Sequence, residues 1–377
     1  MNVIFTCGGT AGHINPAIAV ANIWKERHPE GKILFIGAQG HMEERLVPAA
    51  GYDLKVLPAS GMARGKNFVA LKHNARAVKR IVSGIRACKK IIKEFQPDVV
   101  IGTGGYASFP ALMAAHMMGI PTCVHESNAM PGLTTRLVAD KVDRVMICFP
   151  ESAKHYRNHE KAEVVGMPVR REFLYTKKED ARRQLGIGDE PLVVSAFGSQ
   201  GARAMNLMTA ELFALEQQQN FPFRHIHAVG SFGWEWMPDA VKEQGVELEN
   251  CPSIDMREYI YNMPTVMTAA DVVISRAGSA SCNEIAATGT PCILIPSPNV
   301  TDNHQEKNAR ALEAEGGAIV VTEKECSASA IMDTILQLLN DPGKRSRMQT
   351  ALHKMAVPDS AERICGIMEE LAAGSKE

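Results

Sequence analysis

Short apolar runs alternate with amphipathic stretches along the first half of the chain. Runs typical of buried strands are NVIFTC, KILFIG, DLKVLPA, DVVIGT and PTCVHE. Between them, apolar residues at helical spacing predict helices near residues 17–27, 68–95 and 110–118. Alternation of strand and helix is the pattern of a parallel sheet that carries helices on its faces. The sequence therefore predicts an α/β fold.

The same alternation starts again after Gly166. The segment LVVSAFGSQGARAMNLMTAELF repeats the arrangement of VIFTCGGTAGHINPAIAVANIW, in which a buried strand ends in a glycine-rich turn that opens a helix. A chain of 377 residues is also too long for one ordinary core. We predict two doubly wound domains, residues 1–165 and 166–357, with a terminal helix in residues 358–377 that packs back on the first domain.

Composition narrows the class of protein. The nine cysteines form no CxxC pair and no regular spacing, so neither a zinc site nor a disulfide framework is indicated, and a reducing cytosol fits best. The N-terminus reads as a first strand, because it lacks the basic and apolar regions of a signal peptide. Residues 99–124 carry no Lys, Arg, Asp or Glu, but their glycines and prolines favour strand, loop and helix over a membrane span.

Charge is distributed unevenly along the chain. Residues 1–166 carry a net charge of +8 and residues 167–377 one of −9. Residues 66–95 hold nine Lys and Arg against the single acid Glu94. We interpret the apolar stripe of this segment as the side that packs on a sheet. Its basic face is expected to bind an anionic membrane surface reversibly, and no nucleic acid is expected as a partner.

Three glycine-rich loops each follow a predicted strand: residues 8–13 (GGTAGH), 102–108 (GTGGYAS) and 197–202 (FGSQGA). Glycine lets a backbone approach a ligand closely, and the helix that follows presents unpaired N–H groups, which suit a diphosphate. One such loop is weak evidence for a binding site, because tight turns also use glycine for structural reasons alone. Three loops at the carboxyl ends of strands, where open sheets bind ligands, favour a binding site.

Missing motifs restrict the chemistry further. None of the loops is GxGxxG and there is no GxxxxGK[ST], which argues against a dinucleotide oxidoreductase and a P-loop phosphotransferase. There is also no Asp-x-Asp, the kind of carboxylate cluster that holds a nucleotide sugar through a divalent metal. We therefore expect no metal and no cofactor, with leaving-group charge met by backbone dipoles and cations.

The motifs GGTAGHINPA, GTGGYASFPA, HESNAMPGLTTR, GMPVR, FGSQGA, SRAGSASCNEIAATGTPCILIP and DNHQEKNA occur in an order that closely resembles the MurG family. The resemblance implies the GT-B glycosyltransferase fold, two Rossmann-like domains facing across a cleft. It implies inverting, metal-independent transfer of GlcNAc from UDP-GlcNAc to the MurNAc 4-hydroxyl of lipid I, which gives lipid II for peptidoglycan synthesis. It also implies a peripheral protein on the cytoplasmic face of the cell membrane.

Site residues follow from the resemblance position by position. Donor contacts are implied for Thr10, Ala11, Gly12, Asn128, Arg170, Ser199, Ile260, Ser279, Ala280, Glu284 and Gln305, and acceptor contacts for Gly104, Gly105 and Tyr106. The chemistry of these side chains agrees with the implied contacts. Glu284 can accept hydrogen bonds from ribose hydroxyls, Gln305 can donate to and accept from sugar hydroxyls, and Ser199 suits a phosphate.

Two questions stay open at this stage. One base must take a proton from the acceptor hydroxyl, and His13 and Glu126 are both candidates. The alternatives are that His13 only caps its helix, that Glu126 and His125 brace loops, and that Arg276 is structural. Ala11 also departs from the GGTGGH usual in the family. If that position needed a positive φ, alanine would be strained by about 1 kcal/mol or more.

Other functions remain as rivals. The nearest is another GT-B transferase with a different lipid or small-molecule acceptor. A UDP-GlcNAc 2-epimerase would share the fold and the nucleotide sugar but need no second substrate. A sensor that binds a nucleotide sugar would show tight binding and no turnover.

Overall fold

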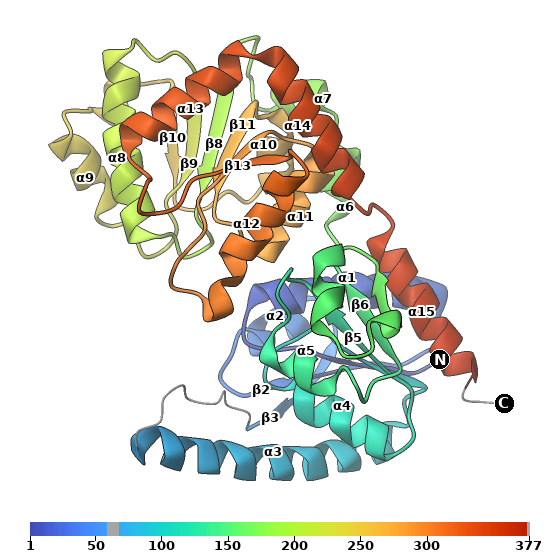
Figure 1. The fold of residues 1–377 in the computed structure, drawn as a ribbon. Helices are drawn as coiled ribbons and strands as arrows, with labels where there is room; N and C mark the ends of the chain where they lie inside the picture. Colours follow the sequence, from blue (N-terminus) through green and yellow to red (C-terminus); the bar gives the residue numbers. More distant parts are fainter. Residues whose placement is uncertain (59–67, 375–377) are drawn as a thin grey trace. The chain divides into compact units, whose positions relative to one another are not determined.

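A computed structural model describes residues 1–58 and 68–374 of the chain, which forms two compact units (Figure 1). Unit 1 comprises Met1–Pro168 and Asp359–Glu377, and unit 2 comprises Val169–Pro358. The chain therefore leaves unit 1, builds unit 2, and returns.

Unit 1 is built on a seven-stranded sheet in the order β3-β2-β1-β4-β5-β6-β7, and every neighbouring pair runs parallel. The strand order reverses direction between β1 and β4, which is where doubly wound sheets bind ligands. The strands are β1 (Val3–Thr6), β2 (Ile33–Ala38), β3 (Asp53–Leu57), β4 (Val99–Gly102), β5 (Thr122–Glu126), β6 (Arg144–Ile147) and β7 (Ala162–Val164).

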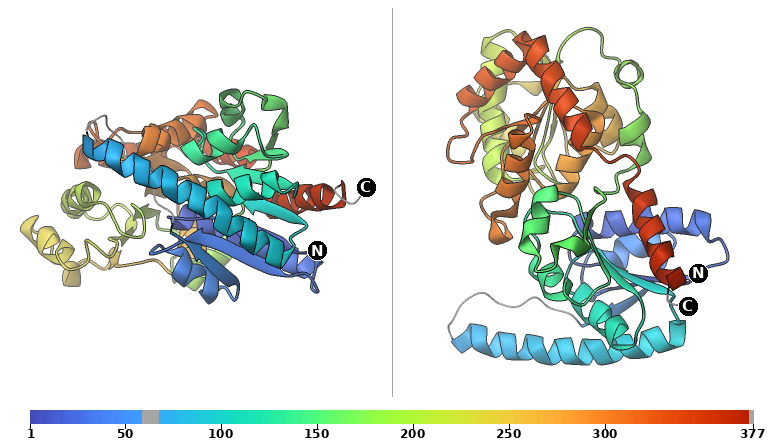
Figure 2. Two further views of the ribbon diagram at one scale, coloured as in Figure 1. Left: turned by 90° about the horizontal axis from the view of Figure 1, so that it is seen from below. Right: turned by 45° about the vertical axis from the view of Figure 1, so that its right-hand side comes forward.

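Helices cover both faces of this sheet (Figure 2). They are α1 (Ala11–Arg27), α2 (Glu43–Ala49), α3 (Phe68–Phe95), α4 (Ser108–Met117), α5 (Leu133–Val138) and α15 (Ser360–Gly374), with short 3₁₀ turns at Pro150–His155 and His159–Lys161. Side chains of a strand alternate between faces. Val3 and Phe5 accordingly pack in the core that includes α1 and α15, whereas Ile4 packs in the core that includes α3 and α4.

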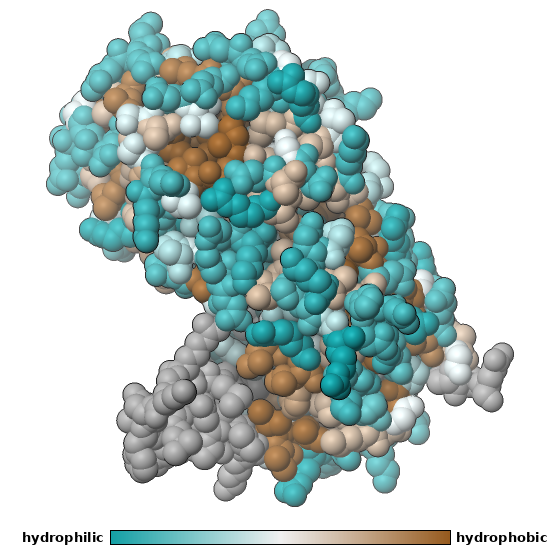
Figure 3. Space-filling model, viewed as in Figure 1, coloured by the Kyte–Doolittle hydropathy of each residue, from teal (hydrophilic) through white to brown (hydrophobic). Residues whose placement is uncertain are grey.

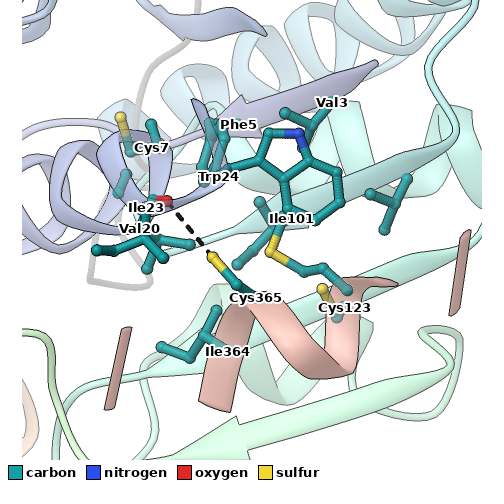
Figure 4. Close-up of a cluster of buried hydrophobic side chains, with 14 of the residues drawn as sticks. Val3, Phe5, Cys7, Val20, Ile23, Trp24, Ile101, Cys123, Ile364 and Cys365 are labelled. Carbon is teal, nitrogen blue, oxygen red and sulfur yellow. Dashed lines mark hydrogen bonds between the residues drawn. The ribbon is translucent and has the colours of Figure 1, made fainter. Parts of the chain in front are cut away.

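The last helix, α15, packs on the first helix of the chain. Figure 4 shows Ile364 and Cys365 of α15 in one buried cluster with Val20 and Trp24 of α1. The Cys365 thiol donates to the carbonyl oxygen of Val20 at 3.6 Å. Because Trp24 and Cys365 are completely buried, α15 is part of the core of unit 1.

Unit 2 repeats the same topology with six parallel strands in the order β10-β9-β8-β11-β12-β13. Its strands are β8 (Leu192–Ala196), β9 (Arg224–Ala228), β10 (Ile254–Arg257), β11 (Val272–Ser275), β12 (Cys292–Leu294) and β13 (Ala318–Val320). Its helices are α6 (Arg171–Tyr175), α7 (Lys178–Gln184), α8 (Arg203–Gln218), α9 (Met237–Glu243), α10 (Met263–Ala269), α11 (Ser279–Thr288), α12 (His304–Ala314), α13 (Ala328–Asn340) and α14 (Pro342–Met355), with 3₁₀ turns at Leu248–Asn250 and Thr301–Asn303.

A buried polar chain joins α8 to the sheet of unit 2. The Glu216 carboxylate lies 2.7 Å from Nδ1 of His225, whose Nε2 lies 2.7 Å from Oγ of Ser195. The same hydroxyl lies 2.7 Å from Nδ1 of His227. All four side chains are buried, and burial together with the nearby His225 lowers the pKa of His227 from 6.5 to about 3. His227 is therefore neutral in the folded protein at neutral pH.

One predicted element differs from the observed one. The first helix was predicted to begin near residue 17, but α1 begins at Ala11 and contains Pro16. Proline removes one backbone donor, yet the rest of this helix is packed on a core, so the helix continues through it. The uncharged stretch 99–124 forms β4, α4 and the start of β5, as predicted. Among the residues that the structure describes, no helix combines the length and the apolar character required to cross a membrane.

Candidate functional site

In unit 1, three loops converge at the carboxyl ends of the neighbouring strands β1, β4 and β5. The β1 loop leads into α1 and its His13, the β4 loop contains Gly104 and Gly105, and the β5 loop begins after Glu126. The Thr103 hydroxyl donates to the carbonyl oxygen of His13 at 2.7 Å. The fold thus brings together the predicted acceptor loop and both candidate bases.

The β1 loop is held by Glu43, a residue that sequence reasoning missed. Its carboxylate is completely buried and accepts from the backbone N–H of Gly9 at 3.2 Å and of Ala38 at 2.8 Å. A Cβ on Gly8 would lie 2.9 Å from this carboxylate, and one on Gly37 would lie 2.5 Å from Cγ of Glu43. The two glycines therefore leave space for the side chain that fixes the loop. Nothing in the sequence pattern distinguishes Glu43 from a surface acid.

Ala11 is not strained. It is the first residue of α1, so its backbone is helical, and Thr10 before it is extended, with φ −135° and ψ 154°. The positive φ of this loop, +88°, belongs to Gly9. The predicted cost of alanine at position 11 is therefore absent, because the left-handed position lies two residues earlier.

The β1 and β4 loops pack without side chains between them. Gly105 has φ +86°, and a Cβ there would lie 2.2 Å from the carbonyl oxygen of Gly8. Gly104 has φ +106° and borders the imidazole of His13. The buried Ser108 hydroxyl donates within this corner, to the carbonyl oxygen of Gly104 at 2.6 Å or of Thr6 at 3.0 Å. The backbone of this corner is consequently fixed from several directions, while Tyr106 stays half exposed.

Glu126 accepts hydrogen bonds with both of its carboxylate oxygens. Oε1 accepts from the backbone N–H of Asn128 at 3.0 Å and from its side-chain amide at 3.1 Å, and Oε2 accepts from the N–H of Gly132 at 3.0 Å. His125 lies behind it, with Nε2 2.8 Å from the carbonyl oxygen of Gly166. Burial lowers the pKa of His125. These contacts agree with the bracing alternative for both residues, and the choice between His13 and Glu126 as the base stays a prediction.

In unit 2, the loop between β8 and α8 depends on a close crossing of two backbones. A Cβ on Gly201, with φ +78°, would lie 2.0 Å from the carbonyl oxygen of Val229. A Cβ on Gly230, with φ +82°, would lie 2.1 Å from the nitrogen of Gly201. The Ser231 N–H donates to the Ser199 carbonyl oxygen at 3.3 Å. The loop is therefore supported by the segment that follows β9, and Ser199 is exposed on it.

The helix α11 begins beside the same edge of the sheet, after β11. Gly278 precedes it with extended backbone, Ser279 opens it, and Ala280 and Glu284 follow in its first two turns. Burial raises the pKa of Glu284 to about 7, and the Arg170 guanidinium partly opposes this shift. Since the pKa lies near neutrality, the carboxyl group of Glu284 changes charge in the physiological range.

Three further residues lie at this carboxyl edge of unit 2. Ile260 is buried in the loop after β10. The Gln305 side-chain oxygen accepts from the N–H of Ser297 at 2.9 Å, which leaves its amide N–H groups for a ligand. Arg276 forms an ion pair with Glu323 at 2.6 Å and donates to a backbone carbonyl, which agrees with a structural role.

Within residues 1–58 and 68–374, no group of three or more His, Cys, Asp or Glu side chains is arranged to hold a metal ion.

Two doubly wound units with glycine loops at their carboxyl edges define the architecture of GT-B glycosyltransferases. Sequence comparison agrees. Residues 3–147 match the glycosyltransferase family 28 N-terminal domain and residues 192–364 match the glycosyltransferase family 28 C-terminal domain. Among solved structures, that of MurG from Acinetobacter baumannii superposes with a TM-score of 0.76 at 23% identity, covering 98% of this chain and 99% of that chain. A UDP-GlcNAc 2-epimerase from Neisseria meningitidis superposes with a TM-score of 0.66 at 14% identity, covering 98% and 100%.

Curated relatives match over almost their whole length. The chain is 41% identical to the UDP-N-acetylglucosamine--N-acetylmuramyl-(pentapeptide) pyrophosphoryl-undecaprenol N-acetylglucosamine transferase of Acetivibrio thermocellus, covering 98% of both chains. It is 38% identical to the protein of the same name from Caldanaerobacter subterraneus subsp. tengcongensis, covering 98% of this chain and 100% of that one. The chain therefore belongs to glycosyltransferase family 28 and, within it, to the MurG family.

Proposed function

We propose that the protein transfers GlcNAc from UDP-GlcNAc to the MurNAc 4-hydroxyl of lipid I, a sugar-peptide carried on a polyprenyl diphosphate, with inversion at the anomeric carbon. The observation that carries this proposal is the identity of 41% over 98% of the chain to a transferase named for these substrates. The product is lipid II, so the protein acts in peptidoglycan synthesis.

The proposed donor site lies at the carboxyl edge of unit 2. The diphosphate binds the Ser199 loop and the start of α11 at Ser279 and Ala280, where N–H groups and the helix dipole favour negative charge. Glu284 accepts hydrogen bonds from the ribose hydroxyls, and the backbone of Ile260 contacts the uracil ring. The Gln305 side-chain amide donates to the sugar hydroxyls. Further donor contacts are proposed for Arg170, Asn128 and the β1 loop from Thr10 through Ala11 to Gly12.

The proposed acceptor site lies at the loops of unit 1, with Gly104, Gly105 and Tyr106 beside His13. His13 takes the proton from the acceptor hydroxyl as that oxygen attacks the anomeric carbon and the bond to UDP breaks. Glu126 positions the β5 loop, because both of its oxygens already accept hydrogen bonds. The negative charge that develops on UDP is stabilised by N–H groups and the dipole of α11.

We further propose that the protein binds the cytoplasmic face of the cell membrane peripherally. The side chains of residues 68–79, which include the predicted Lys72 and Lys79, lie outside the part that the structure describes. In the rest of α3, exposed cations are Arg80, Arg86, Lys90 and Lys93. Exposed Val82 on α3 and Met117 on the neighbouring α4 add apolar surface.

A direct assay tests the function. Purified protein, UDP-GlcNAc and a short-chain lipid I analogue should give the disaccharide product and UDP in equal amounts, and excess EDTA should leave the rate unchanged. Release of a 2-epimerised sugar without acceptor would instead favour an epimerase. Binding of UDP-GlcNAc with no turnover on any lipid or soluble acceptor would contradict the proposal.

A further inference from the structure

The short helix α5 exposes two leucines on one side. Leu133 is 50% exposed and Leu137 is 53% exposed, and residues four apart lie one above the other on a helix. Thr135 and Val138, on the opposite side, are almost completely buried. The helix therefore has a buried side that packs on unit 1 and an outer side that presents two neighbouring apolar side chains. Figure 3 shows apolar surface over the region of α4 and α5.

This outer side is fixed beside the loops of unit 1. The Thr134 hydroxyl donates to the carbonyl oxygen of Gly105 at 3.4 Å. Gly132, directly before α5, donates its N–H to Glu126 at 3.0 Å. Tyr106 follows Gly105 and is 50% exposed. Gly132 and Thr134, on either side of Leu133, are thus tied to the corner that holds the proposed acceptor loop. Leu133 and Tyr106 each lie one residue from the Thr134–Gly105 hydrogen bond.

The acceptor has an apolar part that such a surface suits. A polyprenyl diphosphate has its charged group between the sugar and the chain. The backbone N–H groups of the glycine loops suit the diphosphate, so the first isoprene units must leave it over the surface that adjoins those loops. Single exposed leucines are common on protein surfaces. Two neighbouring leucines beside a diphosphate site offer apolar area that the polyprenyl chain of the acceptor can cover.

We infer that Leu133, Leu137 and Tyr106 bind the first isoprene units of the acceptor, so that this side of α5 makes the enzyme sensitive to the lipid part of its substrate. This inference rests on the proposed function and adds to it a subsite for the chain. A membrane is the alternative occupant of this side of α5. The exposed Val82 on α3 and Met117 on α4, which belong to the proposed membrane surface, provide the comparison.

The test uses the full-length protein and two acceptors with the same sugar, peptide and diphosphate. One carries several isoprene units and remains soluble, and the other carries a single methyl group. In the wild type, KM should be lower for the isoprenoid acceptor. In Leu133→Ser/Leu137→Ser, KM for the isoprenoid acceptor should rise about five- to tenfold because the apolar contact is lost. A tenfold rise corresponds to roughly 1.4 kcal/mol of binding free energy. KM for the methyl acceptor and kcat for both should stay unchanged.

The matched control is Val82→Ser/Met117→Ser, which removes a similar apolar pair elsewhere on unit 1. It should leave both KM values unchanged in the vesicle-free assay and weaken sedimentation with vesicles. Equal KM changes for the two acceptors, or loss of vesicle binding by the leucine variant without any change in KM, would overturn the inference. Absence of transfer to either acceptor by the wild type is a different result, because it removes the proposed function itself. Thermal unfolding and UDP-GlcNAc affinity, measured for each variant, report whether the fold is retained.

Discussion

Gly104 lies directly against His13. A Cβ at position 104 would be 2.6 Å from Nδ1 and 2.7 Å from Cε1 of the imidazole, and the backbone there has φ +106°. The absence of a side chain on Gly104 is therefore a condition for the position of His13 on α1. Because the proposed base must meet the acceptor hydroxyl closely, this contact connects a backbone feature to catalysis.

Gly104→Ala should reduce kcat at least tenfold by displacing the imidazole, and leave UDP-GlcNAc affinity within about twofold. The matched control is Gly119→Ala. Gly119 also has positive φ, +72°, but nothing lies within 4 Å of a Cβ there, so it reports backbone strain alone. Calorimetry and steady-state kinetics measure both effects. Equal losses of kcat in the two variants would show that strain, and not displacement of His13, is responsible.

His13→Ala should lower kcat by about 100- to 10,000-fold while UDP-GlcNAc binding changes little, as expected for loss of a general base. Glu126→Gln removes the charge that accepts from the β5 loop, so it should mainly lower thermal stability and raise KM for the acceptor. Kinetics and thermal melts of both variants separate the roles. If Glu126→Gln alone abolishes turnover with an unchanged melting temperature, Glu126 is the base.

Donor affinity should depend on pH through Glu284. With a pKa of about 7, the carboxyl group is mostly ionised at pH 8 and mostly protonated at pH 6. If the carboxylate accepts from ribose hydroxyls, the affinity for UDP-GlcNAc should fall about tenfold from pH 8 to pH 6. The diphosphate of UDP-GlcNAc does not titrate in this range. Glu284→Gln should bind about tenfold or more weakly at pH 8 and lose the pH dependence. A parallel pH dependence in Glu284→Gln would assign the titration to another group.

The stability of unit 2 should fall in mild acid because of His227. Its pKa in the folded protein, about 3, lies below the 6.5 of the unfolded chain. The unfolded state therefore binds an extra proton below pH 6.5, and stability is lost as the pH falls from 6.5 toward 3. The slope is roughly 1.4 kcal/mol per pH unit from this group. His227→Leu should show a smaller decrease of its urea midpoint between pH 7 and pH 5 than the wild type. Equal decreases in both proteins would exclude His227 as the source.

Membrane binding should depend on the described cations of α3. Arg86→Glu/Lys90→Glu should lower partitioning onto anionic vesicles at least tenfold, because each cation near anionic lipid contributes about 1 kcal/mol. The control Arg183→Glu/Lys242→Glu reverses two exposed cations of unit 2 and should partition like the wild type. Sedimentation of the wild type with vesicles should also decrease when salt is raised from about 50 to about 500 mM, because salt screens surface charges. Wild-type binding that does not respond to salt would reject this surface.

Much of the architecture could be predicted because apolar periodicity and glycine position are local signals. The helix 68–95 agrees with α3, and the three glycine loops lie at the carboxyl ends of β1, β4 and β8. The start of α1 was missed, because Pro16 reads as a helix boundary unless the packing of the preceding turn is known. Glu43 was missed for a different reason: its partners, Gly9 and Ala38, come together only in the folded sheet.

The packing of α15 on α1 has a consequence for the order in which the protein can be made. Val20 and Cys365 touch although 345 positions separate them, and both belong to the core of unit 1. On a ribosome that adds about 5 to 20 residues per second, β1 and α1 wait tens of seconds for α15. Unit 2, whose segments are contiguous, emerges in full during that interval. Unit 1 can therefore complete its core only after α15 has been synthesised, when the sequence of unit 2 has already been translated.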